Sequence, residues 1–530
     1  MLPDLIITGG QVVDGSGTKA FRADVAIRDG HILDIGDLQV DASVPRLDAT
    51  GLLVAPGFID IHSHSDFTLL VDPRAVSSIA QGVTLEVVGN CGHGCAPIAD
   101  PELAKGNIYG YREDFGLDWQ SMAAYLDRLE EGQSAVNALG LVPNGNLRLA
   151  VAGLVDRPST ADELAQMKKL LQQGLEEGAF GYSTGLEYGP ERACPEEEIA
   201  ALCHLTSAAG GFYATHTRNR DGEAREAIAE AIRTAEVAEV PLQISHISVV
   251  ARLVDDGGWA VAQALDQVEE ARHRGLDVGF DMHTRLFGTT NLSAALPPWA
   301  LEGERAEVAA RLKSPATRAE LKNYPSIITA LARGDWERIV LCDSKAHPER
   351  SRQSISAIAA ARDVEPFDVV FDLLLDEIDD LHSLMIIALS YREEDLRRAF
   401  EHPACMIGSD ATALAPDGPL AASTFHGAYT WAAWFFRHFV RDTHRLTPEE
   451  AVRRLTCLPA GRLGLKNRGL IRRGNCADLA IFDPQTFGEC GTTFEPNQTA
   501  SGMVHVLVNG VVALKNGEFT GARSGEVLRS

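Results

Sequence analysis

Two histidines, separated by a single serine, end the segment GFIDIHSH, which follows a short apolar run. Residues two apart on a strand point to the same side, so the imidazoles of His62 and His64 can reach one ion. Taken alone, such a pair is just as typical of two polar residues at a strand end. Its meaning depends on the side chains that the fold places beside it.

Four more residues of metal-binding type end or follow other strand-like runs. They are Cys91 after VTLEVV, His216 at the end of GFYATH, His246 at the end of LQISH and Asp410 at the end of CMIGSD. Imidazole nitrogen, thiolate sulfur and carboxylate oxygen are the ligand atoms that zinc takes in proteins. A hydrogen-bonded core histidine is the commoner fate of one such residue, but five strands that each present a ligand indicate a metal site.

A (βα)8 barrel can bring these strand ends together. Eight strand candidates alternate with helical stretches such as 160–177 and 223–238, and barrel enzymes carry their chemistry at the carboxyl ends of the strands. The candidates are 57–62, 83–88, 135–142, 179–184, 211–216, 242–246, 276–283 and 405–410. About 120 residues separate the last two. Because long loops are usually functional, we expect an active-site lid at about 284–345.

Both ends of the chain have a different pattern from the middle. Residues 1–55 alternate short apolar runs with turn signals, and the same pattern returns in 466–530. We therefore expect a small β-sandwich domain built from both termini, with the barrel and its lid occupying 56–465.

Charge and composition narrow the partners. The formal net charge is −26, which opposes binding to nucleic acid or to an acidic membrane surface. No apolar run reaches the roughly 18 residues of a membrane span, and the first residues lack a basic signal region. Nine cysteines, an odd number, do not suggest a disulfide framework. A cytoplasmic protein with a small-molecule substrate is expected, and a homo-oligomer is compatible with the sequence.

Several longer motifs resemble those of one enzyme group. The histidine pair, His216, His246, Asp410 and the tail motif GNCADLAIFD resemble the amidohydrolase superfamily. More specific motifs are similar to the N-acyl-D-amino-acid deacylases, also called D-aminoacylases, over essentially the whole chain. These motifs are GNCG around Cys91, GYSTGLEYGP, YATHTR, LPPWA, LPAGRLGL and GARSGEVLR.

The resemblance implies a TIM barrel flanked by a β-sandwich, and it assigns the metal ligands. Cys91, His216 and His246 would hold a tight zinc, and His62, His64 and Asp410 would frame a second, weaker metal position. Many superfamily members bridge two metals with a carboxylated lysine on the fourth strand, but AFGYST has no lysine. The thiolate of Cys91 can take its place. Two further residues of the loop, His93 and Cys95, are expected to lie near the site without binding metal.

The resemblance implies hydrolysis of a linear amide, and the ligand set implies that the nucleophile is water activated on zinc. Asp410 would act as the proton shuttle, first as general base and then as general acid toward the leaving nitrogen. Tyr188, in the GLEYGP loop, lies where the family contacts its substrate.

The chain departs from the family at the positions associated with the free carboxylate of the substrate. Ser248 replaces a lysine, the segment 281–285 replaces a DYYP-like motif, and LAASTFHG (420–427) replaces an HPR motif. We expect the altered pocket wall to include His283, and the compensating cations to be Arg218, Arg220 or Arg285. The expected substrate is therefore not a simple N-acyl-D-amino acid.

Two other classes of protein remain open. A deaminase or a cyclic-amide or lactone hydrolase can use the same metal site with a different pocket, although the missing lysine argues against the cyclic-amide branch. A noncatalytic scaffold on this fold is the other alternative, since fold alone does not determine function. A scaffold has little need of six intact ligands.

Overall fold

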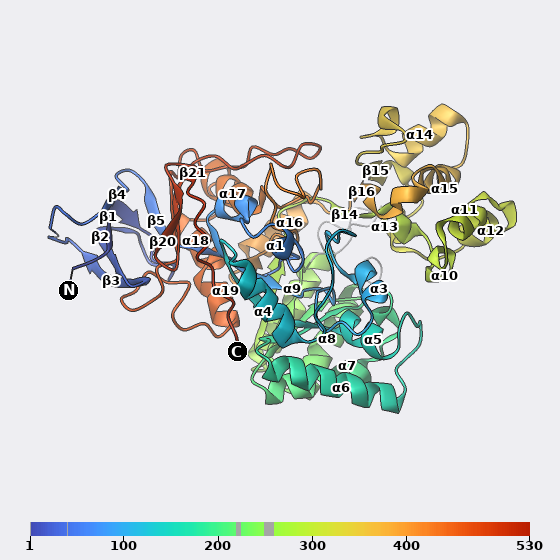
Figure 1. Cartoon of the computed structure of the whole chain (residues 1–530), viewed down its shortest axis with the longest axis horizontal. Coiled ribbons are helices and arrows are strands. Elements are labelled where there is room, and N and C mark those ends of the chain that lie inside the picture. The colour runs from blue at the N-terminus through green and yellow to red at the C-terminus, as the bar shows by residue number, and fades with distance from the viewer. Residues whose placement is uncertain (1, 40, 219–223, 248–258) are drawn as a thin grey trace.

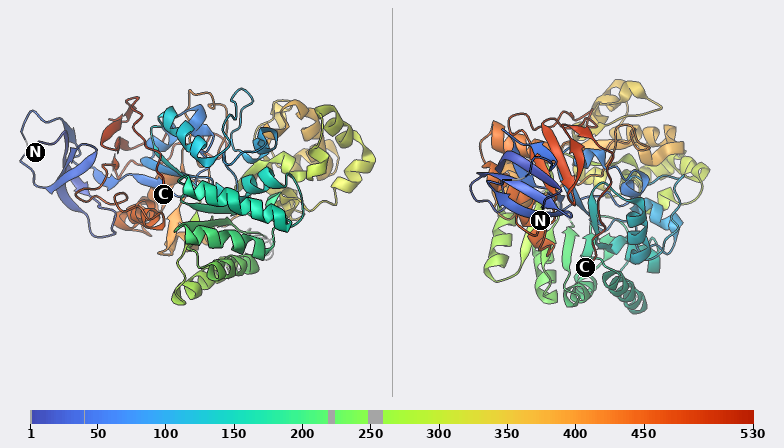
Figure 2. Two further views of the ribbon diagram at one scale, coloured as in Figure 1. Left: turned by 60° about the horizontal axis from the view of Figure 1, so that its bottom comes forward. Right: turned by 60° about the vertical axis from the view of Figure 1, so that its left-hand side comes forward.

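The computed structural model describes residues 2–39, 41–218, 224–247 and 259–530. It has three parts (Figure 1): a central barrel, a sheet formed by the two chain termini, and a helical subdomain between the seventh and eighth barrel strands. The subdomain lies at the opposite end of the molecule from the N-terminal strands, as Figure 1 and the left view of Figure 2 both show.

Eight parallel strands form the barrel, and they overlap the eight candidates of the sequence, although β6 and β17 end before the ligand-type residues His62 and Asp410. They are β6 (Phe58–Asp60), β7 (Val83–Val88), the divided strand β8 (Asn137–Gly140) and β9 (Val142–Pro143), β10 (Gly181–Gly185), β11 (Phe212–His216), β12 (Leu242–Ile244), β13 (Val278–Met282) and β17 (Cys405–Ile407). Strand β7 pairs with β6 and β8, and the order β9-β10-β11-β12-β13-β17 completes the circuit. Beyond the last strand, the Asp410 amide donates to the His62 carbonyl at 2.9 Å, which closes the barrel. The predicted fold class is confirmed.

Amphipathic helices cover the outside of the barrel. They include α4 (Met122–Gly132), α6 (Ala161–Glu176), α7 (Glu196–Ala208), α8 (Ala224–Ala238), α9 (Trp259–His273), α16 (Glu393–Glu401) and α18 (Pro448–Leu455). In α6, Thr160 and Glu163 form a capping box that satisfies the first free amides, while Met167 and Leu171 are buried. Within the part of the chain that the structure describes, no helix is both long and apolar enough to cross a bilayer.

The termini together build one nine-stranded sheet. Its strands are β1 (Leu5–Val12), β2 (Phe21–Arg28), β3 (His31–Gly36), β4 (Arg46–Asp48), β5 (Leu53–Pro56), β18 (Leu479–Phe482), β19 (Met503–Val508), β20 (Val511–Lys515) and β21 (Glu518–Phe519). The antiparallel pair β5 and β18 joins the two ends of the chain. Side chains from both ends, such as Ile7, Val25, Leu479 and Leu507, share one apolar core.

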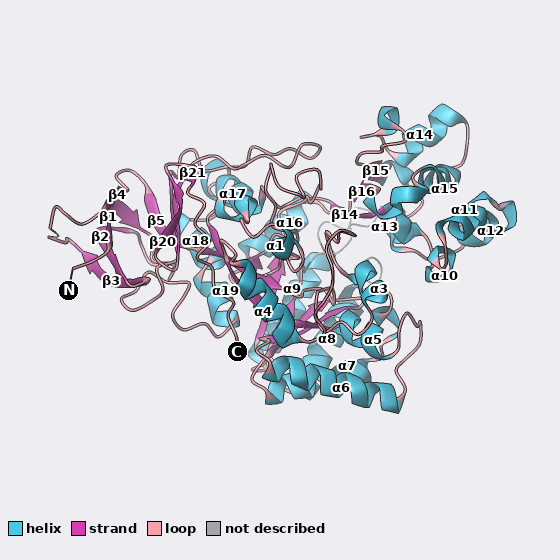
Figure 3. Ribbon diagram, viewed as in Figure 1, coloured by secondary structure: helices cyan, strands magenta, loops and turns pink. Residues whose placement is uncertain are grey.

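The subdomain between β13 and β17 has its own core. A three-stranded antiparallel sheet, in the order β14 (Gly288–Asn291), β16 (Met385–Ala388), β15 (Ile339–Leu341), is surrounded by helices (Figure 3). These helices are α10 (Pro298–Leu301), α11 (Arg305–Lys313), α12 (Pro315–Leu321), α13 (Ile327–Ala332), α14 (Ile355–Arg362) and α15 (Pro366–Asp376). The core runs from Leu292 to Ala388, so the insertion continues well past residue 345.

Candidate metal centre

The six predicted ligands converge at the carboxyl ends of the barrel strands. Their ligand atoms form two groups that share Cys91, and within each group the atoms lie within 4.8 Å of one another. One group is His62, His64, Cys91 and Asp410, and the other is Cys91, His216 and His246. Five of the six residues are buried, and Asp410 is partly exposed.

Cys91 lies between the two groups. Its Sγ is 3.2 Å from Nε2 of His62 and 3.6 Å from Nε2 of His246. On the other side, Oδ1 of Asp410 is 3.2 Å from Nε2 of His64 and 3.5 Å from Nε2 of His62. A mixed set of thiolate, imidazole and carboxylate groups at these separations has the ligand chemistry of a zinc site.

Three of the predicted ligands stand in the left-handed backbone region just beyond a strand. The φ angles are 54° at Cys91, 31° at His246 and 46° at Asp410. Non-glycine residues seldom adopt positive φ, and such strain clusters at functional sites. The turn out of each strand contributes to the convergence of the three side chains.

Asp281, on β13, binds two of the predicted ligands. Its Oδ1 accepts from Nδ1 of His62 at 3.0 Å and from the backbone amide of His246 at 2.7 Å. Gln243 donates to the other oxygen at 2.8 Å. Because Nδ1 of His62 is engaged with Asp281, Nε2 is the nitrogen that faces Cys91 and Asp410.

Glu187 plays the corresponding part for His216. Its Oε2 lies 3.0 Å from Nε2 of His216, whereas the buried Nδ1 of His216 has no hydrogen-bond partner. The buried Nδ1 of His64 is also unpartnered. Buried polar atoms are nearly always satisfied in native proteins, so orphaned nitrogens in a ligand cluster fit a bound metal ion.

The charges of the cluster favour the ligand forms of Cys91 and Asp410. Burial alone raises the pKa of the Cys91 thiol, but the charge of His62 and the hydrogen bond with His246 outweigh it and hold the pKa well below its ordinary value. Burial likewise raises the pKa of Asp410, but its hydrogen bond with His64 and the nearby positive charges leave it well below the ordinary range.

Aromatic rings surround the cluster. The ring of Tyr188 lies 4.7 Å from that of His216, and the ring of Tyr109 lies 4.5 Å from that of His64. His93 packs between the two tyrosines, at 4.9 and 5.1 Å, and its Nδ1 lies 2.7 Å from the Cys91 carbonyl oxygen. Burial, followed by the charge of His64, lowers the pKa of His93 to about 4, so its ring is neutral at neutral pH.

The pocket residues expected from the sequence lie in different settings. His283 is buried, with its ring 5.2 Å from Tyr391 and 6.3 Å from His246. Arg285 is also buried and bonds to Asp410 at 3.0 Å. Arg218 donates instead to Glu230 and to the carbonyls of Arg192 and Cys194. Ser248 and Arg220 lie outside the described residues.

Cys95 belongs to the apolar core. It is 1% exposed, its pKa is raised by burial, and it is in neither ligand group. Its carbonyl accepts from the indole of Trp119 at 2.6 Å.

Asp281, Glu187 and Tyr109 are the neighbours of the site that the sequence analysis did not identify. Asp281 and Glu187 do stand at the ends of predicted strands or in a motif, so their positions carried a signal. Tyr109 lies in a turn just after the short 3-10 helix Lys105–Asn107, and no strand end or motif in the sequence places it.

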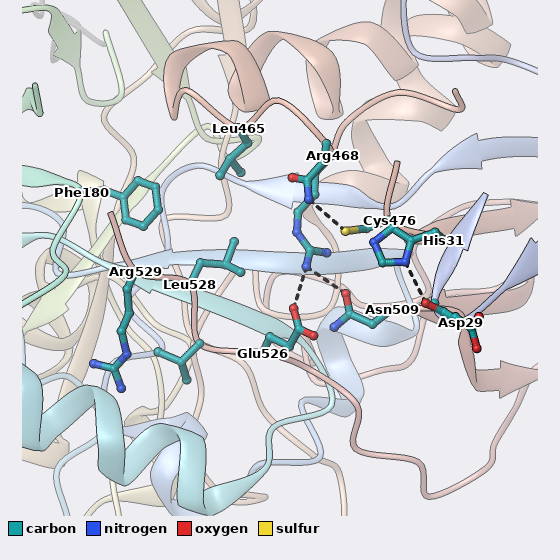
Figure 4. A pocket seen from close by; sticks show the side chains of 13 residues that line it. Asp29, His31, Phe180, Leu465, Arg468, Cys476, Asn509, Glu526, Leu528 and Arg529 are labelled. Carbon is teal, nitrogen blue, oxygen red and sulfur yellow. Dashed lines mark hydrogen bonds and ion pairs between the residues drawn. The ribbon is translucent and has the colours of Figure 1, made fainter. Parts of the chain in front are cut away.

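A cavity of about 630 Å³ lies elsewhere, between the terminal sheet and the barrel (Figure 4). Its lining includes Phe180, which precedes β10, whereas the ligand neighbour Glu187 follows that strand. The cavity is therefore at the opposite end of the barrel strands from the ligands. Arg468 crosses it and donates to Asn509 at 2.9 Å and to Glu526 at 3.1 Å.

Comparison with known proteins agrees with the fold. The model of the Amidohydrolase family matches residues 47–514, and the chain belongs to this family. Among its full-length relatives, it is 33% identical to the D-aminoacylase of Alcaligenes xylosoxydans xylosoxydans, over 99% of this chain and 97% of that protein.

Two solved structures are similar along the whole chain. A D-aminoacylase studied for one-metal activation and second-metal attenuation in its binuclear metal centre is 30% identical, with a TM-score of 0.82 over 99% of this chain and 100% of that one. The N-acyl-D-glutamate deacylase of Bordetella bronchiseptica, complexed with zinc and a phosphonate mimic of the tetrahedral intermediate, is 28% identical. Its TM-score is 0.81, and each chain is covered over 100%.

Proposed function

We propose that this chain is a zinc-dependent amidohydrolase that cleaves a linear amide bond, in an N-acyl amino acid or a related N-acyl compound. One observation carries the proposal: the ligand atoms of Cys91, His216 and His246 lie within 4.8 Å of one another, beside a second group that contains Asp410. Full-length similarity to deacylases supports the same reaction class.

The cluster fits zinc, because its donors are thiolate and imidazole and the buried Nδ1 of His216 has no protein partner. Cys91, His216 and His246 would hold the tight ion, and His62, His64 and Asp410 would frame a weaker position. Zinc bound there supplies Lewis acidity toward a carbonyl oxygen and makes water a better nucleophile at neutral pH.

Asp410 is the proton carrier in this proposal. It is partly exposed, unlike the other five ligands, so its carboxylate is accessible to water and to substrate from the barrel mouth. It accepts a proton from the attacking water and delivers it to the leaving nitrogen. The low pKa of its carboxylate keeps it in the basic form before the reaction starts.

In this proposal the preferred substrate lacks a free carboxylate, the group associated with the lysine, DYYP-like and HPR positions that this chain has replaced. In support, Arg218 and both Nη atoms of Arg285 donate within the protein, and the rings of Tyr109, Tyr188 and His93 form a neutral wall. Losing two charged hydrogen bonds of roughly 1.5–3 kcal/mol each costs on the order of 10²-fold in recognition.

The test is zinc analysis of the purified protein followed by a substrate screen. The panel holds N-acyl-D-amino acids, N-acyl-L-amino acids, their carboxamides, neutral amides, esters and cyclic amides. We expect about one tightly bound zinc and the highest kcat/KM on a linear amide. Less than about a tenth of an equivalent of transition metal in folded, active protein would contradict the metal assignment. A preference for a free acid by about 10²-fold would contradict the neutral-substrate assignment.

Cellular location is a further part of the proposal. We place the protein in the cytoplasm, in support of which all nine cysteines are free thiols. Self-association stays a prediction, which light scattering of the purified protein would test.

A further inference from the structure

Arg285 occupies an unusual place for an arginine at a barrel mouth. It follows β13 and is only 7% exposed. Its Nη1 donates to the carbonyls of Ser409, at 2.7 Å, and of His426. Its Nη2 donates to Asp410 twice, at 3.0 Å to the backbone carbonyl and at 3.0 Å to Oδ2. The remaining donor, Nε, is buried.

These contacts make the two oxygens of Asp410 unequal. Oδ1 faces His64 and His62, at 3.2 and 3.5 Å, while Oδ2 is bonded to Arg285. The guanidinium also binds two carbonyls of the 409–410 backbone, so it ties the carboxylate to its own main chain. A planar, doubly anchored guanidinium restricts rotation of the Asp410 side chain more than a flexible ammonium would.

A second loop makes room for this guanidinium. At Gly427, where φ is +103°, a Cβ atom would lie 2.2 Å from Nη1 of Arg285. The preceding residue, His426, supplies one of the acceptor carbonyls, and its own ring binds the Thr493 carbonyl at 2.6 Å. The residues that accept hydrogen bonds from Arg285 and leave space for it therefore come from two segments, 409–410 just after β17 and the loop at 426–427.

We propose that Arg285 is a positioning residue for Asp410 and not a substrate anchor. It holds Oδ1 toward the ligand cluster, and its positive charge weakens cation binding in the His62, His64 and Asp410 group. The catalytic half of this inference rests on the proposed function, whereas the charge effect concerns metal binding alone and can be tested without any substrate.

The test compares Arg285→Gln, Arg285→Lys and a matched control. The control is Arg462→Gln, because Arg462 is just as buried and pairs with Asp277 at 2.8 Å, before the start of the same strand β13. We expect Arg285→Gln to lower kcat by at least about tenfold and to change KM by less than about threefold, equally for an N-acyl amino acid and its carboxamide. Arg285→Lys keeps the positive charge but loses the planar group with two separate Nη donors, and it should lower kcat by a smaller factor.

A double-mutant cycle separates an action through Asp410 from a general structural role. In the Asp410→Asn background, Arg285→Gln should change kcat by less than about twofold, since residues that act as one unit are not additive. If Arg285→Gln lowered kcat in the Asp410→Asn background by the same factor as in the wild type, the proposal would be overturned. So would a rise in KM confined to the free acid, which is the signature of a substrate anchor.

Zinc titration of the metal-free proteins gives a readout independent of activity. Removing a positive charge beside a divalent cation should tighten the weaker zinc position by at least about threefold in Arg285→Gln, with the tight position unchanged. Arg285→Lys and Arg462→Gln should bind like the wild type. Unchanged or weakened binding at the second position of Arg285→Gln would overturn the charge effect. If the wild type hydrolyses nothing in the panel, the proposed function fails, and this titration still decides the role of Arg285.

Discussion

Both ends of the barrel contain buried charged side chains, but their arrangement differs. At the cavity between the barrel and the terminal sheet, each charge faces a partner: Arg468 bonds to Asp478, Asn509 and Glu526. At the carboxyl ends of the strands, six ligand-type residues converge, and the buried Nδ1 atoms of His64 and His216 have no protein partner.

The comparison shows that the cavity and the six convergent ligand-type residues lie in different places. The cavity of about 630 Å³ is lined by side chains that satisfy one another, which is the arrangement of a structural junction. The ligand cluster is compact, and its buried imidazole nitrogens without a protein partner fit the binding of a metal ion. The following variants test this distinction in order of their expected effect on turnover.

Cys91→Ala should have the largest effect. The thiolate is shared by both ligand groups, so its loss should remove most bound zinc and lower turnover by at least about 10³-fold. Elemental analysis and steady-state kinetics measure the two effects. The control is Cys95→Ala, four residues away in the apolar core, which should keep zinc and turnover. Equal losses in both variants would mean that Cys91 acts through folding instead of through the metal.

Asp410→Asn should separate binding from chemistry. Cys91, His216 and His246 remain, so the tight zinc should stay, but turnover should fall by at least the roughly 10²-fold that a positioned acid and base contributes. Zinc content and kcat are measured on the same preparation. Near-normal turnover would remove Asp410 from the proton-transfer role.

Residues at strand ends could be predicted from the sequence because strand geometry places them. His62 and His64 follow β6 directly and fall in one group of ligand-type residues, and parallel pairing brings His216, His246 and Asp410 to one end of the barrel. The barrel strands were predictable for the same reason, since each is a short apolar run between helical stretches.

Residues that depend on contacts between loops could not be placed in this way. Arg285 was expected as a substrate cation, but its partners are on segments about 125 to 140 residues further along the chain. Sequence spacing carries no information on whether such a donor faces the substrate or a carbonyl. The extent of the inserted subdomain was equally hidden, because β14 pairs with β16 across a long helical stretch.

Glu187→Gln should have a smaller effect than the changes of the ligands. Glu187 would act on a bound zinc through His216, whose Nε2 it meets at 3.0 Å. Outer carboxylates of this kind typically contribute about 10–100-fold to metal affinity. Competition with a chelator should show a loss of that size for the tight zinc, while zinc-saturated enzyme keeps most of its turnover. Glu197→Gln, at an exposed position on α7, is the control and should bind zinc normally. An unchanged zinc affinity in Glu187→Gln would show that His216 does not depend on Glu187 for its orientation.

Arg468→Gln should affect stability and leave turnover nearly unchanged. Arg468 and Asp478 are 4% and 6% exposed in their side chains, and the variant removes a charged partner from a buried carboxylate. Asp478 still accepts from the Asn509 amide at 2.7 Å, so the expected loss is about 1–3 kcal/mol in the free energy of unfolding, below the roughly 3–5 kcal/mol of a fully stranded buried charge. Denaturant unfolding measures this loss, and kcat per folded molecule should stay within about twofold of the wild type. Arg473→Gln breaks an ion pair with Asp34 of β3, whose side chains are 66% and 37% exposed, so it should cost little stability. A tenfold fall in kcat for zinc-loaded, folded Arg468→Gln would link the cavity to the chemistry, and the contrast between the two ends of the barrel would no longer hold.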